Sequence, residues 1–290
     1  MARSLRELRR KIKAVQHIRQ ITRAMKMVAT AKLKRIQRTV ENSRRYQEEL
    51  RRLLADVASA SVEVDHPYLQ AREVERVGVL VVGGDRGLCG AFNRQIDEQA
   101  VEFIAGQSAP VEVITVGNRM CRYADRHGLD VVSSHPGVAR GDDPDIDQII
   151  GEVRSWYESS HVDLVQVVYA RFDSLVRHPA ISEQLLPLSP QAFAQATDGA
   201  GPVPVEYIFE PPAAQLLAEL LPRALEVEIA QILLTTQASG QAARMTAMSA
   251  ATDNADEMIT GLTRSVNRAR QEEITAGLLD VVTGARALQS

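Results

Sequence analysis

Residues 3–60 contain neither glycine nor proline, and this absence restricts the fold more than any other feature of the chain. Apolar residues recur there at steps of three and four, the spacing of a helix with a narrow apolar stripe. The series is Leu5, Leu8, Ile12, Val15, Ile18, Met25, Val28, Ile36 and Val40. At ~1.5 Å per residue the helix is on the order of 85 Å long. It needs an equally long partner, and Pro67 in the stretch HPYL ends it.

A second long helix is predicted from Pro211 almost to the end of the chain. Its apolar stripe is Leu216, Leu220, Val227, Leu234, Met245, Met248, Ile259, Leu262, Val266, Ala269, Leu278 and Val281. Its interruptions are Pro222, Gly240, Gly261, Gly277 and Gly284. Each glycine costs roughly 1 kcal/mol relative to alanine, so the helix requires a partner packed beside it. We therefore expect the two ends to form a long antiparallel coiled coil.

The middle of the chain has a different character, with short runs of β-branched residues separated by helical stretches. Strands are predicted at 77–82, 111–116, 164–172 and 205–209, the last after a loop at 197–204. Helices are predicted near 91–106, 117–127 and 145–158. This alternation is typical of an α/β layer with a largely parallel, Rossmann-like sheet. The predicted division is an N-terminal coiled-coil helix at 1–62, an inserted α/β domain at 63–210 and a C-terminal coiled-coil helix at 211–290.

Composition restricts the setting of the protein. Two cysteines, Cys89 and Cys121, do not make a disulfide framework, which favours a reducing compartment. No apolar run approaches the ~20 residues that span a bilayer. The arginine-rich start lacks a cleavage site and its helical pattern is too long for a signal or transit peptide. The low aromatic content of 4% favours long helices over a large mixed core.

Charge is distributed unevenly along the chain. Residues 1–54 carry 17 basic and 4 acidic residues, a net charge of +13, and the remainder carries a net charge of −16. Such polarity indicates an anionic partner: a nucleic acid, a lipid or an acidic protein surface. A basic coiled-coil protein that binds a polyanion is therefore an alternative function. The basic run lacks the interleaved aromatic residues on which nucleic acid bases stack, which disfavours this alternative.

The stretch VVGGDRGLCGAFN, residues 81–93, raises the question of a phosphate-binding loop. A P-loop requires a lysine after its last glycine, and Ala91 follows Gly90 here. A dinucleotide-binding turn requires the spacing GxGxxG, whereas the glycines here are Gly84, Gly87 and Gly90. A dinucleotide enzyme is therefore disfavoured, although the amides of a helix start can attract an anion. We expect a tight structural turn in which Gly87 is required, no cofactor, and no metal site, since the six histidines are scattered.

Five stretches together resemble the γ subunit of F-type ATP synthases of the bacterial type. They are KIKAVQHIRQITRAMKMVATAKLKR (11–35), DRGLCGAFN (85–93), SEQLLPL (182–188), AARMTAMSAATDNA (242–255) and NRARQEEIT (267–275). The resemblance covers the whole chain in order. It implies a non-catalytic central rotor stalk that couples ion flow through the membrane c-ring to ATP synthesis or hydrolysis at the α and β subunits.

The resemblance also implies the partners and the location. The expected partners are the α₃β₃ hexamer, the ε subunit and the c-ring, with one copy of the chain per complex. The expected location is the cytoplasmic face of the cell inner membrane, as a peripheral protein. A nucleic acid partner is not expected. The basic stripe would face acidic segments of the β subunits, as a screened guide rather than as a strong attachment.

The residues expected at the rotor–β interface follow from the same resemblance. They are Thr22, Arg23, Met25, Lys26, Lys32, Lys34, Arg35, Arg244, Arg270, Gln271 and Thr275, with Ala24 in the same segment. Polar side chains on a helix can bond a passing loop in one rotary state and release it in the next. Bonding inside the coiled coil is the alternative for each of them.

The sequence departs from the family pattern at three places. Gly83-Gly84 stands where a serine or threonine usually precedes DRGLCG, Gly240 replaces a glutamate before QAARM, and Gly277 replaces the glutamate of a terminal ITxE motif. The last change weakens the expectation of a partner contact at position 277. The dithiol insert of the chloroplast subunit is absent, so thiol regulation is not expected.

Overall fold

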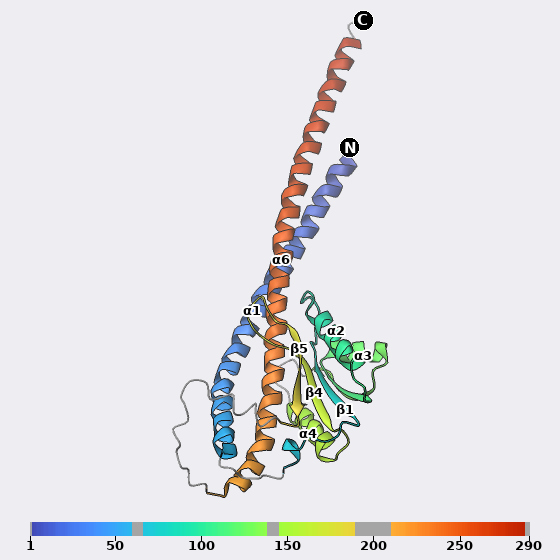
Figure 1. Ribbon diagram of the computed structural model, residues 1–290. Coiled ribbons are helices and arrows are strands. Elements are labelled where there is room, and N and C mark those ends of the chain that lie inside the picture. The colour runs from blue at the N-terminus through green and yellow to red at the C-terminus, as the bar shows by residue number, and fades with distance from the viewer. Residues whose placement is uncertain (1, 60–65, 138–144, 189–209, 288–290) are drawn as a thin grey trace. The chain divides into compact units, whose positions relative to one another are not determined.

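The computed structural model describes residues 2–59, 66–137, 145–188 and 210–287 (Figure 1). Two helices hold the terminal segments: α1 spans Ala2–Ser59 and α6 spans Ala213–Ala287. The intervening elements are η1 (Pro67–Leu69), β1 (Val77–Val82), α2 (Phe92–Ala105), β2 (Val111–Val116), α3 (Asn118–His127), β3 (Val131–His135), α4 (Asp145–Glu158), β4 (Leu164–Ala170) and β5 (Ala180–Leu186). The predicted fold class, long terminal helices around an inserted α/β sheet, is confirmed.

The chain forms two compact units. One contains residues 1–30 and 244–290, and the other contains residues 31–243. The predicted three-part division at 62/63 and 210/211 follows composition rather than contacts, and it stays a prediction. The predicted strand at 205–209 and the loop at 197–204 lie outside the described residues.

The five strands of the larger unit form one sheet in the order β3-β2-β1-β4-β5. The first four strands are parallel, and β5 runs antiparallel to β4. Sequence patterns missed β3 and β5, which are the two outer strands of this sheet. They also placed the end of β4 two residues too late, because Arg171 and Phe172 have already left the sheet.

Both faces of the sheet are covered, as expected for parallel strands that are apolar along their whole length. On β1, Val77, Val79 and Val81 point into a core shared with α2 and α3. The alternate residues Leu80 and Val82 point into a second core shared with α4, the end of α1 and the start of α6. Figure 1 shows α2 and α3 together beside the sheet, away from α4. The C-terminal end of α1 and the N-terminal part of α6 therefore belong to the core that covers this face of the sheet.

Candidate partner-contact surface

In the smaller unit, the contact between α1 and α6 is made of small and medium-sized side chains. Val15, Thr22 and Ala29 on α1 are buried at intervals of seven residues, and so are Met248 and Ala255 on α6. A seven-residue repeat is the signature of a coiled coil, because it keeps one stripe facing the partner helix. The small residues Ala29 and Ala255 allow the two backbones to approach closely.

Three polar contacts fix the register of this helix pair. Arg19 Nη1 lies 2.7 Å from Asp256 Oδ1, the hydroxyls of Thr22 and Thr252 are 2.8 Å apart, and Lys26 Nζ donates to Ser249 Oγ at 2.9 Å. Residue numbers rise on one helix as they fall on the other, so the helices are antiparallel, as expected. The exposed ion pair contributes little stability and mainly defines which residues face one another.

The first predicted contact segment divides between the inside and the outside of the helix pair. Thr22 is buried, with an exposed fraction of only 8%, and its hydroxyl already bonds Thr252. Arg23, Ala24 and Lys26 are exposed, and Met25 is half-buried. The alternative for these residues, bonding inside the helix pair, therefore holds for Thr22 and for the Nζ atom of Lys26. The exposed face retains Arg23.

The other predicted contact residues lie mostly on exposed helix surface. Lys32, Lys34 and Arg35 are exposed on the part of α1 that belongs to the larger unit. On α6, Arg244 is half-buried, whereas Arg270, Gln271 and Thr275 are exposed. The Thr275 hydroxyl donates to the Gln271 carbonyl at 2.9 Å, a bond within its own helix turn.

The structure overturns part of the predicted apolar stripe. Ile18 and Val28 are more than half exposed, at 54% and 57%, although both were assigned to the helix contact. With Ile21, which is 59% exposed, they form a second apolar series on the outer face of α1. The sequence carried this signal, because two apolar series of helical period overlap in the same segment. Apolar size alone cannot decide which of the two faces the partner helix.

The C-terminal end of α6 is also apolar and exposed. Ile274, Leu278 and Val281 have exposed fractions of 53%, 62% and 70%. Continued to the start of α1, the antiparallel register of Arg19 with Asp256 and of Thr22 with Thr252 reaches about residue 272 of α6. Figure 1 shows the C-terminal end of α6 extending past the N-terminal end of α1. Leu278 and Val281 therefore lie outside the helix contact that their apolar spacing predicts for them.

The glycine-rich stretch forms a turn that Asp85 ties to other parts of the chain. Asp85 Oδ1 accepts hydrogen bonds from the Asn118 backbone at 2.9 Å, the Asn118 side chain at 3.3 Å and the Gly137 backbone at 3.0 Å. The Asp85 carboxylate thus already occupies the first backbone amide of α3, that of Asn118, where it would repel a phosphate. The predicted structural role of the turn fits this arrangement.

The turn does not require glycine at position 87, contrary to the prediction from the sequence. A methyl group at Gly87 meets no heavy atom within 4 Å. At Gly117 a methyl group would lie 2.6 Å from the carbonyl oxygen of Gly83, and the φ angle there is +96°. The prediction for Gly87 was wrong: within this stretch a methyl group would instead meet close neighbours at Gly83, 2.8 Å from Met120 Cβ, and at Gly84, 2.5 Å from Asn93 Oδ1. These neighbouring glycines look alike in sequence. Only the backbone path shows which one has another segment against it.

Two further glycines were singled out as departures from the family pattern. A methyl group at Gly240 would lie 3.3 Å from the ring of Phe92, so the aromatic ring packs where the family has a larger residue. Gly277 has no heavy atom of this chain within 4 Å of the same position. Within this chain, close approach explains a glycine at 240 and does not explain one at 277.

The described part of the chain contains no candidate metal site. Its histidine, cysteine and acidic side chains form no group of three or more that could hold a metal ion. Asp97 on α2 has the most perturbed carboxyl group: burial raises its pKa to about 6, while the nearby Arg119 and Arg126 oppose the shift. No described helix is long and apolar enough to cross a membrane.

The fold and this surface define a class of protein: an antiparallel helix pair, with an α/β sheet inserted between its helices in the sequence. A family model described as ATP synthase matches residues 4–288. The ATP synthase gamma chain of Heliobacterium modesticaldum is 41% identical, with 98% of this chain and 99% of the relative covered. That of Pelotomaculum thermopropionicum is 40% identical, with 99% of both chains covered. The chain belongs to the ATP synthase gamma chain family.

Solved structures share the fold at lower sequence identity. A chain of the Euglena gracilis mitochondrial ATP synthase (OSCP, F1 and c-ring, rotational state 3) has a TM-score of 0.67 at 18% identity, with 99% of this chain and 95% of that chain covered. A chain of the Tetrahymena thermophila mitochondrial ATP synthase central stalk and c-ring has a TM-score of 0.60 at 23% identity, with 80% and 99% covered. The alternative of a polyanion-binding protein finds no support among these matches.

Proposed function

We propose that this chain is the central rotor-stalk, or gamma, subunit of an F-type ATP synthase. It couples ion flow through a membrane c-ring to ATP synthesis or hydrolysis at catalytic sites on the α and β subunits, and it has no catalytic site of its own. The observation that carries this proposal is identity of 41% to an ATP synthase gamma chain across 98% of the chain.

The proposed partners are an α₃β₃ hexamer, an ε subunit and the c-ring, with one copy of the chain in each complex. The proposed location is the cytoplasmic face of the cell inner membrane, where the chain is a peripheral protein. The exposed basic residues and the outer apolar series Ile18, Ile21 and Val28 supply surface for such contacts. Exposed apolar side chains in a series are typical of a surface that a partner covers.

The proposed mechanism is differential contact during rotation. Arg23, Lys32, Lys34 and Arg35 present charged groups that can bond a β-subunit loop in one rotary position and release it in the next. Coupling then arises because each partner conformation favours a different set of contacts. Thr22 contributes through the helix pair, since its hydroxyl bonds Thr252 at 2.8 Å.

Co-purification of the tagged chain from its native membrane tests the assignment. Recovery of α and β subunits supports it, and recovery of nucleic acid alone contradicts it. The charge mechanism is tested by changing Lys32, Lys34, Arg35 and Arg38 together to glutamate. We expect the isolated chain to fold and ATP-driven ion pumping to fall severalfold.

Changing the same four residues to glutamine is the matched control for charge reversal. It removes the charge while keeping similar side-chain lengths, and we expect an intermediate loss of pumping. Unchanged pumping in the glutamate variant would contradict a guiding role for this surface. The loss should be smaller for both variants at high ionic strength, since salt screens exposed charges.

A further inference from the structure

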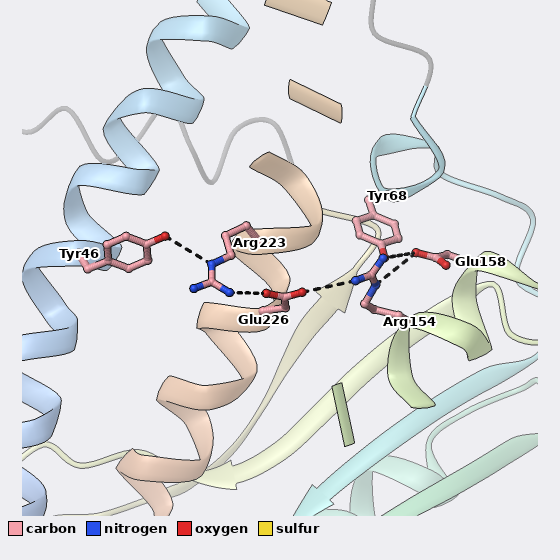
Figure 2. Close-up of polar contacts among 6 residues, drawn as sticks. All are labelled: Tyr46, Tyr68, Arg154, Glu158, Arg223 and Glu226. Carbon is pink, nitrogen blue, oxygen red and sulfur yellow. Dashed lines mark hydrogen bonds and ion pairs between the residues drawn. The ribbon is translucent and has the colours of Figure 1, made fainter. Parts of the chain in front are cut away.

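In the larger unit, six side chains form one continuous chain of polar contacts across four elements (Figure 2). We call this set the polar clasp. Its members are Tyr46 on α1, Arg223 and Glu226 on α6, Arg154 and Glu158 on α4, and Tyr68 on η1.

Glu226 is the centre of the polar clasp, because its two carboxylate oxygens accept from opposite sides. Oε2 accepts from Arg223 Nη1 at 2.8 Å, and Oε1 accepts from Arg154 Nη1 at 3.4 Å. Arg223 in turn directs its Nε–H to the Tyr46 hydroxyl at 3.5 Å. One carboxylate on α6 is thereby connected both to α4 and, through Arg223, to α1.

The other end of the polar clasp reaches the short helix η1. Arg154 donates from Nε and Nη2 to Glu158 Oε1, at 3.4 Å in each case. The hydroxyl of Tyr68, a fully buried side chain, donates to the same Glu158 oxygen at 2.5 Å. Because Tyr68 is buried, this end of the chain is anchored in the core.

The polar clasp borders an apolar contact that supplies most of the cohesion between these elements. Leu221 and Leu225 of α6, Ile149 and Val153 of α4, and Leu54 of α1 belong to one buried cluster. Apolar burial is favourable but has no preferred direction, so it does not by itself fix the rotation of one helix on another. Hydrogen bonds and ion pairs are directional.

The charged groups of the polar clasp are too exposed to contribute much stability. The side chains of Arg154 and Glu226 have exposed fractions of 34% and 27%. Ion pairs of this kind are often worth little net free energy, and replacing them by apolar groups of similar size is often neutral. Their best-attested effect is to specify one arrangement among several of similar stability.

We propose that the polar clasp is a positioning device: it fixes the rotation of the N-terminal part of α6 about its own axis, relative to α4 and α1. A second role rests on the proposed function: the same contacts carry torque between the α/β sheet and the adjoining ends of α1 and α6. Arg154 and Glu226 are its decisive residues, because their bond is the step that connects α6 to α4. The polar clasp therefore sets the orientation of α6 and contributes little to the free energy of unfolding.

The decisive variant replaces both charged partners by an apolar residue of similar length, Arg154→Met with Glu226→Met. Urea unfolding of the isolated chain is followed by the fluorescence of Trp156, the only tryptophan. We expect an unchanged midpoint together with amide hydrogen exchange about three to ten times faster in residues 213–230. Glu219→Gln, on an exposed position of the same helix, is the matched control and should change neither measurement.

In the assembled complex, the ratio of ions pumped to ATP hydrolysed should fall about twofold or more in the double variant. An unchanged exchange rate would overturn the positioning role, and a large drop in the urea midpoint would show that the contacts stabilise rather than position. Faster exchange with an unchanged ratio would overturn the torque role alone. Failure of the proposed function is distinguishable, because the wild-type chain would then not co-purify with α and β subunits.

Discussion

Replacing Gly117 by alanine should weaken the α/β sheet far more than replacing Gly87 by alanine. A methyl group at Gly117 would lie 2.6 Å from the Gly83 carbonyl oxygen and 2.9 Å from its carbon, and the φ angle of +96° already disfavours a side chain. A strained backbone costs about 1–3 kcal/mol and overpacking about 1–3 kcal/mol more. The combined loss is about 2–6 kcal/mol.

The control change at Gly87 has neither cause. Its methyl group meets no heavy atom within 4 Å, so the effect should stay within about 0.5 kcal/mol. Both variants differ from the wild type by one methyl group and both lie in turns of the same domain. Any difference between them therefore reports the local environment rather than the chemistry of the change.

Urea unfolding with Trp156 fluorescence is a suitable assay, because Trp156 is 7% exposed and belongs to the core of this domain. With a slope of about 2 kcal/mol/M, Gly117→Ala should lower the midpoint by about 1–3 M. Gly87→Ala should move it by less than about 0.3 M under the same slope. Equal midpoints, or a larger loss at Gly87, would refute the reasoning from backbone contact.

Three further predictions concern other parts of the chain. Burial raises the Asp97 pKa to about 6, so its stabilising contribution is present below about pH 4 and is lost as pH rises to about 6. Asp97 is partly exposed, so solvent screening reduces the effect, and Asp97→Asn should raise the free energy of unfolding at pH 7 by about 1–2 kcal/mol at most. The urea midpoint of the variant should depend less on pH between about pH 4 and 6 than that of the wild type, and parallel profiles would contradict this. The double variant Thr22→Val with Thr252→Val should change the free energy of unfolding by less than about 1 kcal/mol, because both partners of the bond are removed together. Thermal unfolding followed by circular dichroism at 222 nm measures this. A double variant that is much less stable to heat than either single variant would contradict this expectation. Gly277→Ala should slow amide exchange around residues 274–281 about fivefold, since about 1 kcal/mol of helix propensity is gained and no atom of this chain lies within 4 Å. Unchanged exchange would remove local softness as a reason for this glycine, and failed assembly would indicate a partner that approaches too closely for a methyl group.

Local patterns predicted most of the elements. The predicted helices near 91–106, 117–127 and 145–158 correspond to α2, α3 and α4 within a residue or so at each end. The strands β1, β2 and the start of β4 were also predicted, because buried parallel strands are continuously apolar. The missed strands have polar residues in the middle, as in VVSSH and AISEQLL. They lie at the edges of the sheet, where pairing with a single neighbour permits an exposed polar side chain.

The contact surface was less predictable than the elements. The charged residues Arg23, Lys32 and Lys34 were correctly expected to lie on helices, and they are exposed. Their contacts with partners stay predictions. Ala29 was not expected in the helix contact, because it is not a large apolar residue, and Thr22 was expected there only as the alternative to a partner contact; both are buried. The polar clasp also left no sequence signal, since its members come from four elements far apart in the chain.

The sequence by itself determined the long terminal helices, the α/β alternation and the basic start of the chain. These properties depend on neighbours within a few residues or on composition alone, and both can be read along one dimension. Only the tertiary structure decided which apolar series on α1 faces α6 and which glycine has a carbonyl against it. Only the tertiary structure placed Glu226 between Arg223 and Arg154. Those properties depend on the approach of segments distant in sequence, where a shift of about 1 Å changes a contact into a clash.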